Sequence, residues 1–152
     1  MSSMNPSRPS AQPILIIEDS ADDFEATQRA FAKTNLRNPI RHAWTCEEAL
    51  HWLRSEELVL PGIILLDLNM PGMDGRRMLS LLKEDPALKE IPVVILTTSD
   101  DQRDVRACYE LGANTYIQKP VDFDGLIASI QRLKEYWFEI AVLPRPLKTG
   151  SR

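Results

Sequence analysis

The sequence predicts an α/β domain of the doubly wound class, in which helices cover both faces of a five-stranded parallel sheet. Five short strand-like runs alternate along the chain with five amphipathic stretches, which is the order that parallel strands joined by crossover helices require. The three strongest runs are apolar on both faces, as expected of strands buried between two helical layers. Right-handed crossovers then place helices on both sides of the sheet.

The predicted strands are all short. Three of them are continuous apolar runs, too short to be helices, and cover Ile14–Ile17, Gly62–Leu68 and Pro92–Thr98. Weaker runs at Ile40–Trp44 and Thr115–Gln118 complete the set of five.

The stretches between the strands carry apolar residues at helical spacing. The predicted helices cover Ala21–Thr34, Thr45–Arg54, Arg76–Glu84, Ser99–Gly112 and Asp122–Leu133. Thr45 with Glu48, and Ser99 with Gln102, have the spacing of a capping box at a helix start. Gly112 is placed to end the fourth helix, since glycine readily adopts the left-handed conformation that follows many last turns.

Composition excludes several classes of protein. The chain has 152 residues, 43% hydrophobic and 26% charged, which suits one ordinary globular domain. A net charge of -4 argues against direct binding of nucleic acid. No apolar run is long enough to cross a bilayer. Cys46 and Cys108 form neither a disulfide framework nor a metal-ligand spacing, so we expect a cytoplasmic protein.

Three segments divide the chain. Residues 1–12 are polar and proline-rich, without an apolar signal core, and are expected to be a disordered lead-in. Residues 13–143 are expected to form the domain, including an extended last helix, and residues 144–152 a flexible tail.

Polar side chains end or follow four of the predicted strands, at the edge of the sheet where ligands bind in this fold class. These residues are Glu18, Asp19, Asp67, Asn69, Thr97, Thr98 and Lys119. Crowded carboxylates repel one another, and a divalent cation relieves the repulsion. Oxygen ligands favour Mg²⁺ or Mn²⁺ over zinc. A lysine and a hydroxyl beside a metal-bound acid can stabilise a phosphoryl group, with Asp67 as the nucleophile that forms an acyl phosphate.

Four segments together resemble the signature of the response-regulator receiver family. They are Glu18–Ser20, Leu66–Gly75, Thr97–Thr98 and Lys119–Pro120, within a match from about Pro13 to Leu133. The resemblance implies a flavodoxin-like receiver fold. It also implies a domain that takes a phosphoryl group from a sensor histidine kinase.

The resemblance implies a role for each matched residue. Asp67 is the phosphoacceptor. The metal ligands are Glu18, Asp19, Asp67 and the backbone carbonyl of Asn69, with Mg²⁺ as the cofactor and Mn²⁺ as a substitute. Thr97, Thr98 and Lys119 bind the phosphate, and Tyr116 moves inward with Thr97. The side chains of Asn69 and Ser99 tune acyl-phosphate hydrolysis, and the Lys119–Pro120 bond is expected to be cis.

Several of these residues could instead have a purely structural role. Asp19 could cap the first helix, Thr97 could be an ordinary strand residue, and Tyr116 could belong to the core. Asp74 and Gly75 are assigned only to a turn and a helix start. His42 and His51 have no partner pattern and are interpreted as a strand residue and a helix-surface residue.

Two rival functions remain open. One is a phosphatase of the haloacid dehalogenase type, but that family has an acid two positions after its nucleophile, where this chain has Asn69. The other is a receiver-like binding module that is not phosphorylated. Such modules lose an acid or the lysine, and this chain keeps them all. We expect no enzymatic activity beyond the domain's own phosphotransfer and slow dephosphorylation, with output through protein–protein contacts.

The last predicted helix runs past the usual end of the receiver fold. Its apolar stripe comprises Leu126, Ile130, Leu133, Trp137 and Ile140. Tyr136, Trp137 and Phe138 are consecutive, and neighbours on a helix lie about 100° apart, so all three cannot face the sheet. The surplus aromatic could pack on Val142–Pro146 or form a homodimer. This aromatic extension also resembles a narrower group within the family, the single-domain regulators of bacterial phytochrome kinases.

Overall fold

The computed structural model describes residues 12–55 and 59–144 of the chain. The predicted lead-in and tail therefore lie outside the described residues, except at Gln12 and Pro144. Gln12 is buried, and its carbonyl accepts a hydrogen bond from the side chain of Asn38 at 2.8 Å. This residue already belongs to the packed domain. No helix in the described ranges combines the length and apolarity that crossing a membrane would require.

All five strands form one parallel sheet, and the predicted fold class is confirmed. The strands are β1 (Ile14–Ile17), β2 (Ile40–Ala43), β3 (Ile63–Leu66), β4 (Val93–Thr97) and β5 (Thr115–Gln118), in the spatial order β2-β1-β3-β4-β5. In the register of β1 and β3, Ile17 lies opposite Leu66. The residues that follow these two strands are therefore brought side by side.

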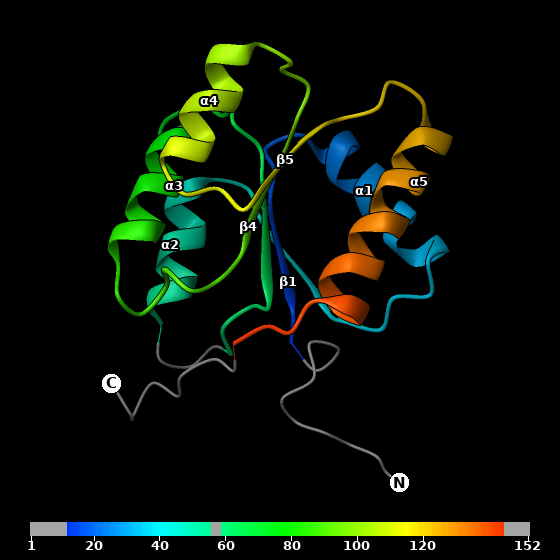
Figure 1. Cartoon of the computed structure of the whole chain (residues 1–152), viewed down its shortest axis with the longest axis horizontal. Helices are drawn as coiled ribbons and strands as arrows, with labels where there is room; N and C mark the ends of the chain where they lie inside the picture. Colours follow the sequence, from blue (N-terminus) through cyan, green and yellow to red (C-terminus); the bar gives the residue numbers. More distant parts are fainter. Residues whose placement is uncertain (1–11, 56–58, 145–152) are drawn as a thin grey trace, which may run out of the picture.

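Helices cover both faces of the sheet (Figure 1). They are α1 (Ala21–Lys33), α2 (Cys46–Arg54), α3 (Gly75–Glu84), α4 (Gln102–Glu110), α5 (Phe123–Lys134) and a π-helical segment η2 (Glu135–Ile140). Helices α1 and α5 pack together on one face, and α2, α3 and α4 cover the other. Each face has its own hydrophobic core.

Alternation along the buried strands explains why their sequences are apolar throughout. In β1, Leu15 and Ile17 point into the core under α2, α3 and α4, whereas Ile14 and Ile16 point into the core under α1 and α5. Successive side chains of a strand face opposite sides of the sheet. A strand covered on both faces therefore needs apolar residues at every position.

The predicted helix starts are confirmed except at α4. Thr45 accepts a hydrogen bond from the backbone N–H of Glu48, as the capping-box spacing predicts. The box predicted at Ser99 is wrong, because α4 begins later and its N-cap is Asp101, whose carboxylate accepts from the N–H of Arg103. The Ser99 hydroxyl instead donates to Asp104. Gly112 ends this segment with a φ of 106°, as predicted.

Beyond Lys134 the last helix widens into the π-helix η2. Trp137 and Phe138 both pack against the core under α1 and α5, while Tyr136 is 52% exposed. One aromatic is left outside the core, as predicted. Placing Ile140 on the buried stripe was wrong, because it is 69% exposed. A π-helix has more residues per turn, so a stripe spaced for an α-helix leaves the buried face.

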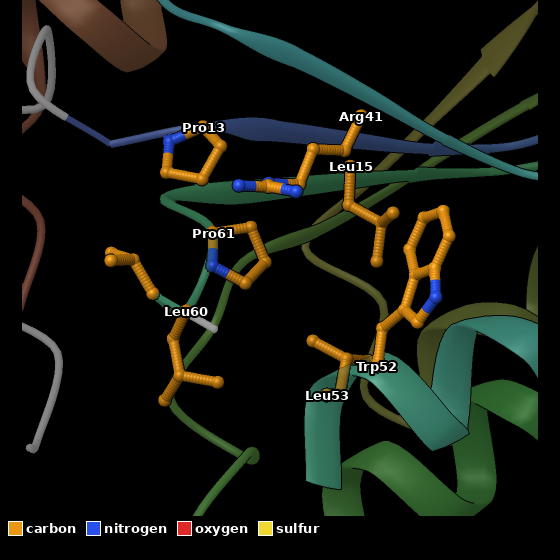
Figure 2. Close-up of a pocket in the computed structure, with 8 residues that line it drawn as sticks. Pro13, Leu15, Arg41, Trp52, Leu53, Leu60 and Pro61 are labelled. Carbon is orange, nitrogen blue, oxygen red and sulfur yellow. The ribbon is translucent and has the colours of Figure 1, made fainter. Parts of the chain in front are cut away.

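A small apolar pocket lies at the amino-terminal end of the sheet (Figure 2). It is lined by residues before and within the strands and at the end of α2, including Pro13, Leu15, Trp52 and Pro61. Its free volume of about 20 Å³ is far below that of ordinary ligand sites. The polar residues identified from the sequence lie at the opposite end of the strands.

Helix α3 begins unusually close to the backbone at Asp67. A Cβ atom on Gly75 would lie 2.5 Å from the carbonyl oxygen of Asp67 and 2.8 Å from the Cα of Leu68. The N–H of Gly75 also donates to the carbonyl of Leu68 at 3.0 Å. Because the contact is with backbone, a side chain here would displace the loop after β3.

We expect Gly75→Ala to lower the free energy of unfolding by about 2 kcal/mol or more, because overpacking against backbone forces a shift. Urea unfolding of the metal-free protein measures the change. Arg77→Ala, at an exposed position two residues further along the same helix, is the control and should stay within about 0.5 kcal/mol of wild type. Equal stability of Gly75→Ala and wild type would contradict the close approach.

Candidate metal and phosphate site

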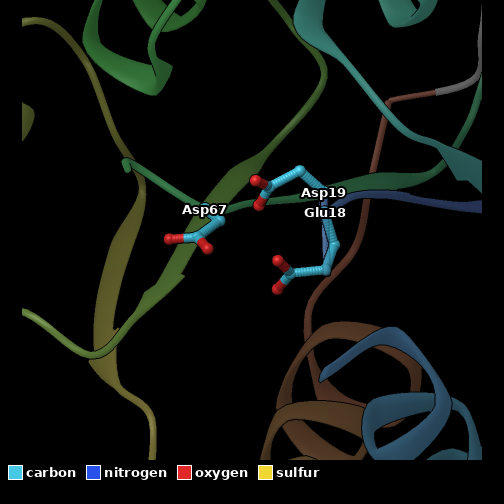
Figure 3. Close-up of side chains that lie close together, drawn as sticks. All are labelled: Glu18, Asp19 and Asp67. Carbon is cyan, nitrogen blue, oxygen red and sulfur yellow. The ribbon is translucent and has the colours of Figure 1, made fainter. Parts of the chain in front are cut away.

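Three carboxylates converge at the carboxyl ends of β1 and β3. One oxygen from each of Glu18, Asp19 and Asp67 lies within 4.8 Å of the other two (Figure 3). Glu18 is buried, Asp67 is half-buried and Asp19 is exposed. The parallel register of β1 and β3 produces this cluster from residues nearly fifty positions apart in the chain.

Lys119 lies among these acids, at the end of β5. Its Nζ is 2.6 Å from Glu18, 3.2 Å from Asp23 and 3.7 Å from Asp67. Burial opposes the charge of Lys119, but the hydrogen bond and negative charge of Glu18, with those of the two aspartates, outweigh it and raise the pKa of Lys119. The ammonium stays charged beside the position that a phosphoryl group on Asp67 would take.

For Glu18, burial outweighs the nearby positive charge and disfavours ionisation. Burial disfavours its ionised form and, with the charge of Asp67, raises the pKa of Glu18 to about 7, although Lys119 acts to lower it. A divalent cation at the cluster would remove this penalty, because it neutralises the carboxylates that crowd one another. The donor set contains only oxygen atoms, which fits Mg²⁺ or Mn²⁺.

Asn69 lies beside the cluster, two residues after Asp67. Its backbone N–H is 3.4 Å from a carboxylate oxygen of Asp67, and its side chain is exposed. The residue is thus placed where its carbonyl could join the metal ligands, and where its side chain faces the solvent that reaches Asp67.

Thr97 has a buried hydroxyl that lacks a partner among the described residues. Its backbone carbonyl accepts a hydrogen bond from the N–H of Lys119 at 2.6 Å. Leaving a buried hydroxyl unsatisfied costs about 1–3 kcal/mol, so such groups are rare without a ligand. The next residue, Thr98, is exposed. Thr97 is therefore the hydroxyl available to a phosphoryl oxygen.

Tyr116 already points inward in this structure. Its hydroxyl donates to the carbonyl of Ser99 at 2.9 Å, and its ring packs against the core under α2, α3 and α4. The Ser99 hydroxyl donates to Asp104 at 2.7 Å, and Asp104 also pairs with Arg76 of α3. Arg76, with Ser99, holds the pKa of Asp104 below its usual range. Loop 99–101 is thus held from both sides.

The expectation, taken from the resemblance, that the Lys119–Pro120 bond is cis was wrong. The described residues contain no cis peptide bond. Trans is the more stable isomer of a bond before proline by about 0.5–1 kcal/mol. The chain here continues from β5 to Asp122, the N-cap of α5.

Sequence reasoning missed two neighbours of the site. Asp23 lies in the first turn of α1, three residues after the N-cap Ser20, and this position close behind Glu18 and Asp19 is the signal that could have identified it. His42, interpreted as a plain strand residue, places its Nε2 2.8 Å from the carbonyl oxygen of Glu18. No sequence spacing encodes that contact, because it joins two different strands.

The aromatics predicted for a dimer interface lie far from this site in the chain. Tyr136, Trp137 and Phe138 belong to η2, at the end of α5. Tyr136 and Trp137 contact each other edge to face, with ring centroids 5.1 Å apart.

Comparison with known proteins agrees with this geometry. Residues 14–131 match the response regulator receiver domain model. The response regulator Rcp1 of Synechocystis sp. is 36% identical over 135 residues, covering 86% of this chain and 92% of Rcp1. The phosphorylated cyanobacterial phytochrome response regulator RcpA superimposes with a TM-score of 0.84 at 35% identity, covering 88% of this chain and 99% of that chain.

A second solved structure bears on the metal. The Mn²⁺-bound form of Rcp1 superimposes with a TM-score of 0.81 at 36% identity, again covering 88% of this chain and 99% of that chain.

We expect the free energy of unfolding of the metal-free protein to fall as the pH rises from about 5 to about 8, relative to Glu18→Gln. The folded pKa of Glu18, about 7, exceeds the unfolded value of 4.5, so the folded state binds the extra proton in this window and raising the pH removes that stabilisation. The effect is a few kcal/mol at most.

Urea unfolding at both pH values, with chelator and then with Mg²⁺, measures this dependence. Mg²⁺ should restore stability to the wild type at high pH, since the cation binds ionised Glu18. A wild type whose pH dependence matches that of Glu18→Gln would contradict the prediction.

Proposed function

The chain belongs to the response regulator receiver domain family, and we propose that Asp67 is its phosphoacceptor. The observation that carries the proposal is the convergence of Glu18, Asp19 and Asp67 around one oxygen-only position, with Lys119 3.7 Å from Asp67. As a response regulator receiver, the protein is a component of two-component signalling.

The phosphotransfer step follows from these positions. An oxygen of the Asp67 carboxylate attacks the phosphorus of a phosphohistidine, and the phosphorus–nitrogen bond breaks. The electron pair stays on the imidazole nitrogen, which takes up a proton. Lys119 stabilises the negative charge that spreads over the phosphoryl oxygens. Thr97 donates its unpartnered hydroxyl to one of those oxygens, which ends the cost of burying it.

Mg²⁺ is the proposed cofactor, with Mn²⁺ as a substitute. The carboxylates of Glu18, Asp19 and Asp67 and the carbonyl of Asn69 would hold it, and a bound cation supplies charge neutralisation at the phosphoryl group. Glu18, the most buried of the three, gains most from the cation because its ionised form is otherwise disfavoured.

The proposed switch connects Asp67 with the surface of α4 and β5. When Thr97 donates a hydrogen bond to the phosphoryl group, Tyr116 can keep its own hydrogen bond to the Ser99 carbonyl. The side chains of Asn69 and Ser99 are proposed to tune the lifetime of the acyl phosphate. The only reactions proposed for the domain are this phosphotransfer and the slow hydrolysis of the acyl phosphate, in which water releases inorganic phosphate and restores the Asp67 carboxylate.

The proposed phosphodonor is a sensor histidine kinase, and a bacterial phytochrome is the favoured kind. This narrower assignment is supported by the similarity to RcpA, a phytochrome response regulator. Output through protein contacts in the cytoplasm is proposed with it. Both cysteines are buried free thiols, which suits a reducing compartment.

A homodimer through the end of the chain is proposed as well. Tyr136, Ile140 and Val142 are 52%, 69% and 95% exposed. Of the internal cover considered from the sequence, Leu143 is buried, whereas Val142 is exposed. The remainder of that alternative cover, beyond Pro144, lies outside the described residues. Self-association would bury these apolar side chains.

We expect acetyl phosphate with Mg²⁺ to add one phosphoryl group to the wild type and none to Asp67→Asn. Intact mass spectrometry measures the adduct, and a chelator should abolish it. Asp22→Asn, on an exposed acid of α1, is the matched control and should be modified like wild type. An unmodified wild type under Mg²⁺ and Mn²⁺ would favour the binding-module alternative.

Tyr136→Lys should shift the protein toward the monomer, because a charge in an apolar interface must be desolvated. Light scattering across a concentration series, with and without acetyl phosphate, measures the mass. Glu90→Lys adds a lysine at an exposed site outside η2 and should leave the mass unchanged. A monomeric wild type at every concentration would exclude the homodimer.

A further inference from the structure

His42 lies on β2, beside the turn that carries Glu18 and Asp19. Its Nε2 is 2.8 Å from the carbonyl oxygen of Glu18. A carbonyl oxygen can only accept a hydrogen bond, so Nε2 must be the protonated nitrogen of the neutral ring, or one of two protonated nitrogens of the charged ring. In either form the His42 ring donates to the backbone of the first acid of the cluster.

The same ring also contacts the start of α1. It stacks on Phe24 with a centroid separation of 3.7 Å and an interplanar angle of 7°. Phe24 follows Glu18 by six residues, and the intervening segment holds Asp19, the N-cap Ser20 and Asp23, the partner of Lys119. His42 therefore holds this segment at both ends.

Strand β2 thus binds Glu18 through two groups. The N–H of Glu18 donates to the carbonyl of Ala43 at 3.1 Å, which extends the sheet pattern by one residue. The His42 ring donates a hydrogen bond to the carbonyl of the same residue, where the sheet ends and the turn begins. Without the ring, the Glu18–Asp19 peptide would have no described anchor on its carbonyl side.

We propose that His42 is a positioning residue for the metal site, which fixes the turn between Glu18 and Phe24 so that the acids converge before a cation binds. The inference rests on the proposed function of this site. A preformed set of ligands loses less conformational freedom on binding, and therefore binds more tightly. Groups that orient metal ligands without touching the metal act in this way.

His42 is not itself a ligand in this proposal. The acid cluster comprises carboxylates alone. The His42 ring donates to the Glu18 carbonyl and stacks on Phe24. It also contacts Trp44, whose ring centroid lies 4.2 Å away at a tilt of 45°. Trp44 also contacts the ring but makes no described contact with the turn, so it provides the control.

The test compares Mn²⁺ affinity of full-length variants by electron paramagnetic resonance, together with thermal unfolding. His42→Phe keeps a flat ring for stacking and removes the donor, and should raise the Kd for Mn²⁺ about five-fold, below the range for direct partners of metal ligands. Trp44→Phe should leave the Kd within two-fold of wild type, whatever its effect on the melting temperature.

A second pair of variants isolates the donor. His42→Gln and His42→Leu both lose the aromatic stack, but only glutamine can donate to the Glu18 carbonyl. His42→Gln should bind Mn²⁺ about three-fold more tightly than His42→Leu. This pair also decides the matter if His42→Phe fails to fold.

The outcomes separate the two proposals. Suppose that the wild type binds Mn²⁺ and accepts a phosphoryl group. Equal Mn²⁺ affinities of His42→Gln and His42→Leu, or of His42→Phe and wild type, would then overturn only the role of His42. Wild type that binds no divalent cation overturns the proposed function and this inference with it. A metal affinity that tracks the donor, rather than the melting temperature, supports positioning by His42.

Discussion

The crowding of three carboxylates at one edge of the sheet is the constraint on which the site depends. Left alone, Glu18 and Asp67 repel each other, and burial makes the ionised form of Glu18 costly. Lys119 offsets part of this cost by its contact at 2.6 Å with Glu18, but one ammonium cannot neutralise three acids. The arrangement therefore favours ligands that bring positive charge, and it keeps the lysine charged for a phosphoryl group. Burial of these acids therefore lowers the stability of the metal-free protein, and a cation bound as proposed would restore it.

The rest of the fold holds these groups in place. Parallel pairing puts the ends of β1 and β3 level, so that Glu18 and Asp67 meet. Pairing of β4 with β5 places the carbonyl of Thr97 against the N–H of Lys119. Helix α3 then approaches so closely that only a residue without a Cβ fits beside Asp67. Each of these contacts is made by backbone atoms, which explains why a rigid site can be built from short strands and ordinary loops.

Much of this architecture could be predicted from the sequence, because it is written in local patterns. The strands are apolar runs buried on both faces, and the acids follow them directly. The start of α4 was misplaced because Ser99 and Asp101 both offer a capping oxygen, and spacing alone does not show which one the helix uses. The π-helical turn at Glu135–Ile140 has no sequence signal of its own. His42 was undervalued because its partner is a main-chain carbonyl on the neighbouring strand, and such contacts depend on register rather than on residue type.

The inward position of Tyr116 has a thermodynamic consequence. Its hydroxyl donates to the carbonyl of Ser99, which joins β5 to the loop before α4. If phosphorylation of Asp67, as proposed, changes the population of this conformation, a protein that recognises the surface formed with Tyr116 inward binds the two forms with different affinities. Linkage requires the reverse effect to be of the same size, because the coupling free energy between two sites is shared. The target of this regulator would in that case also be one of its effectors, drawing phosphate onto Asp67 in proportion to its own abundance.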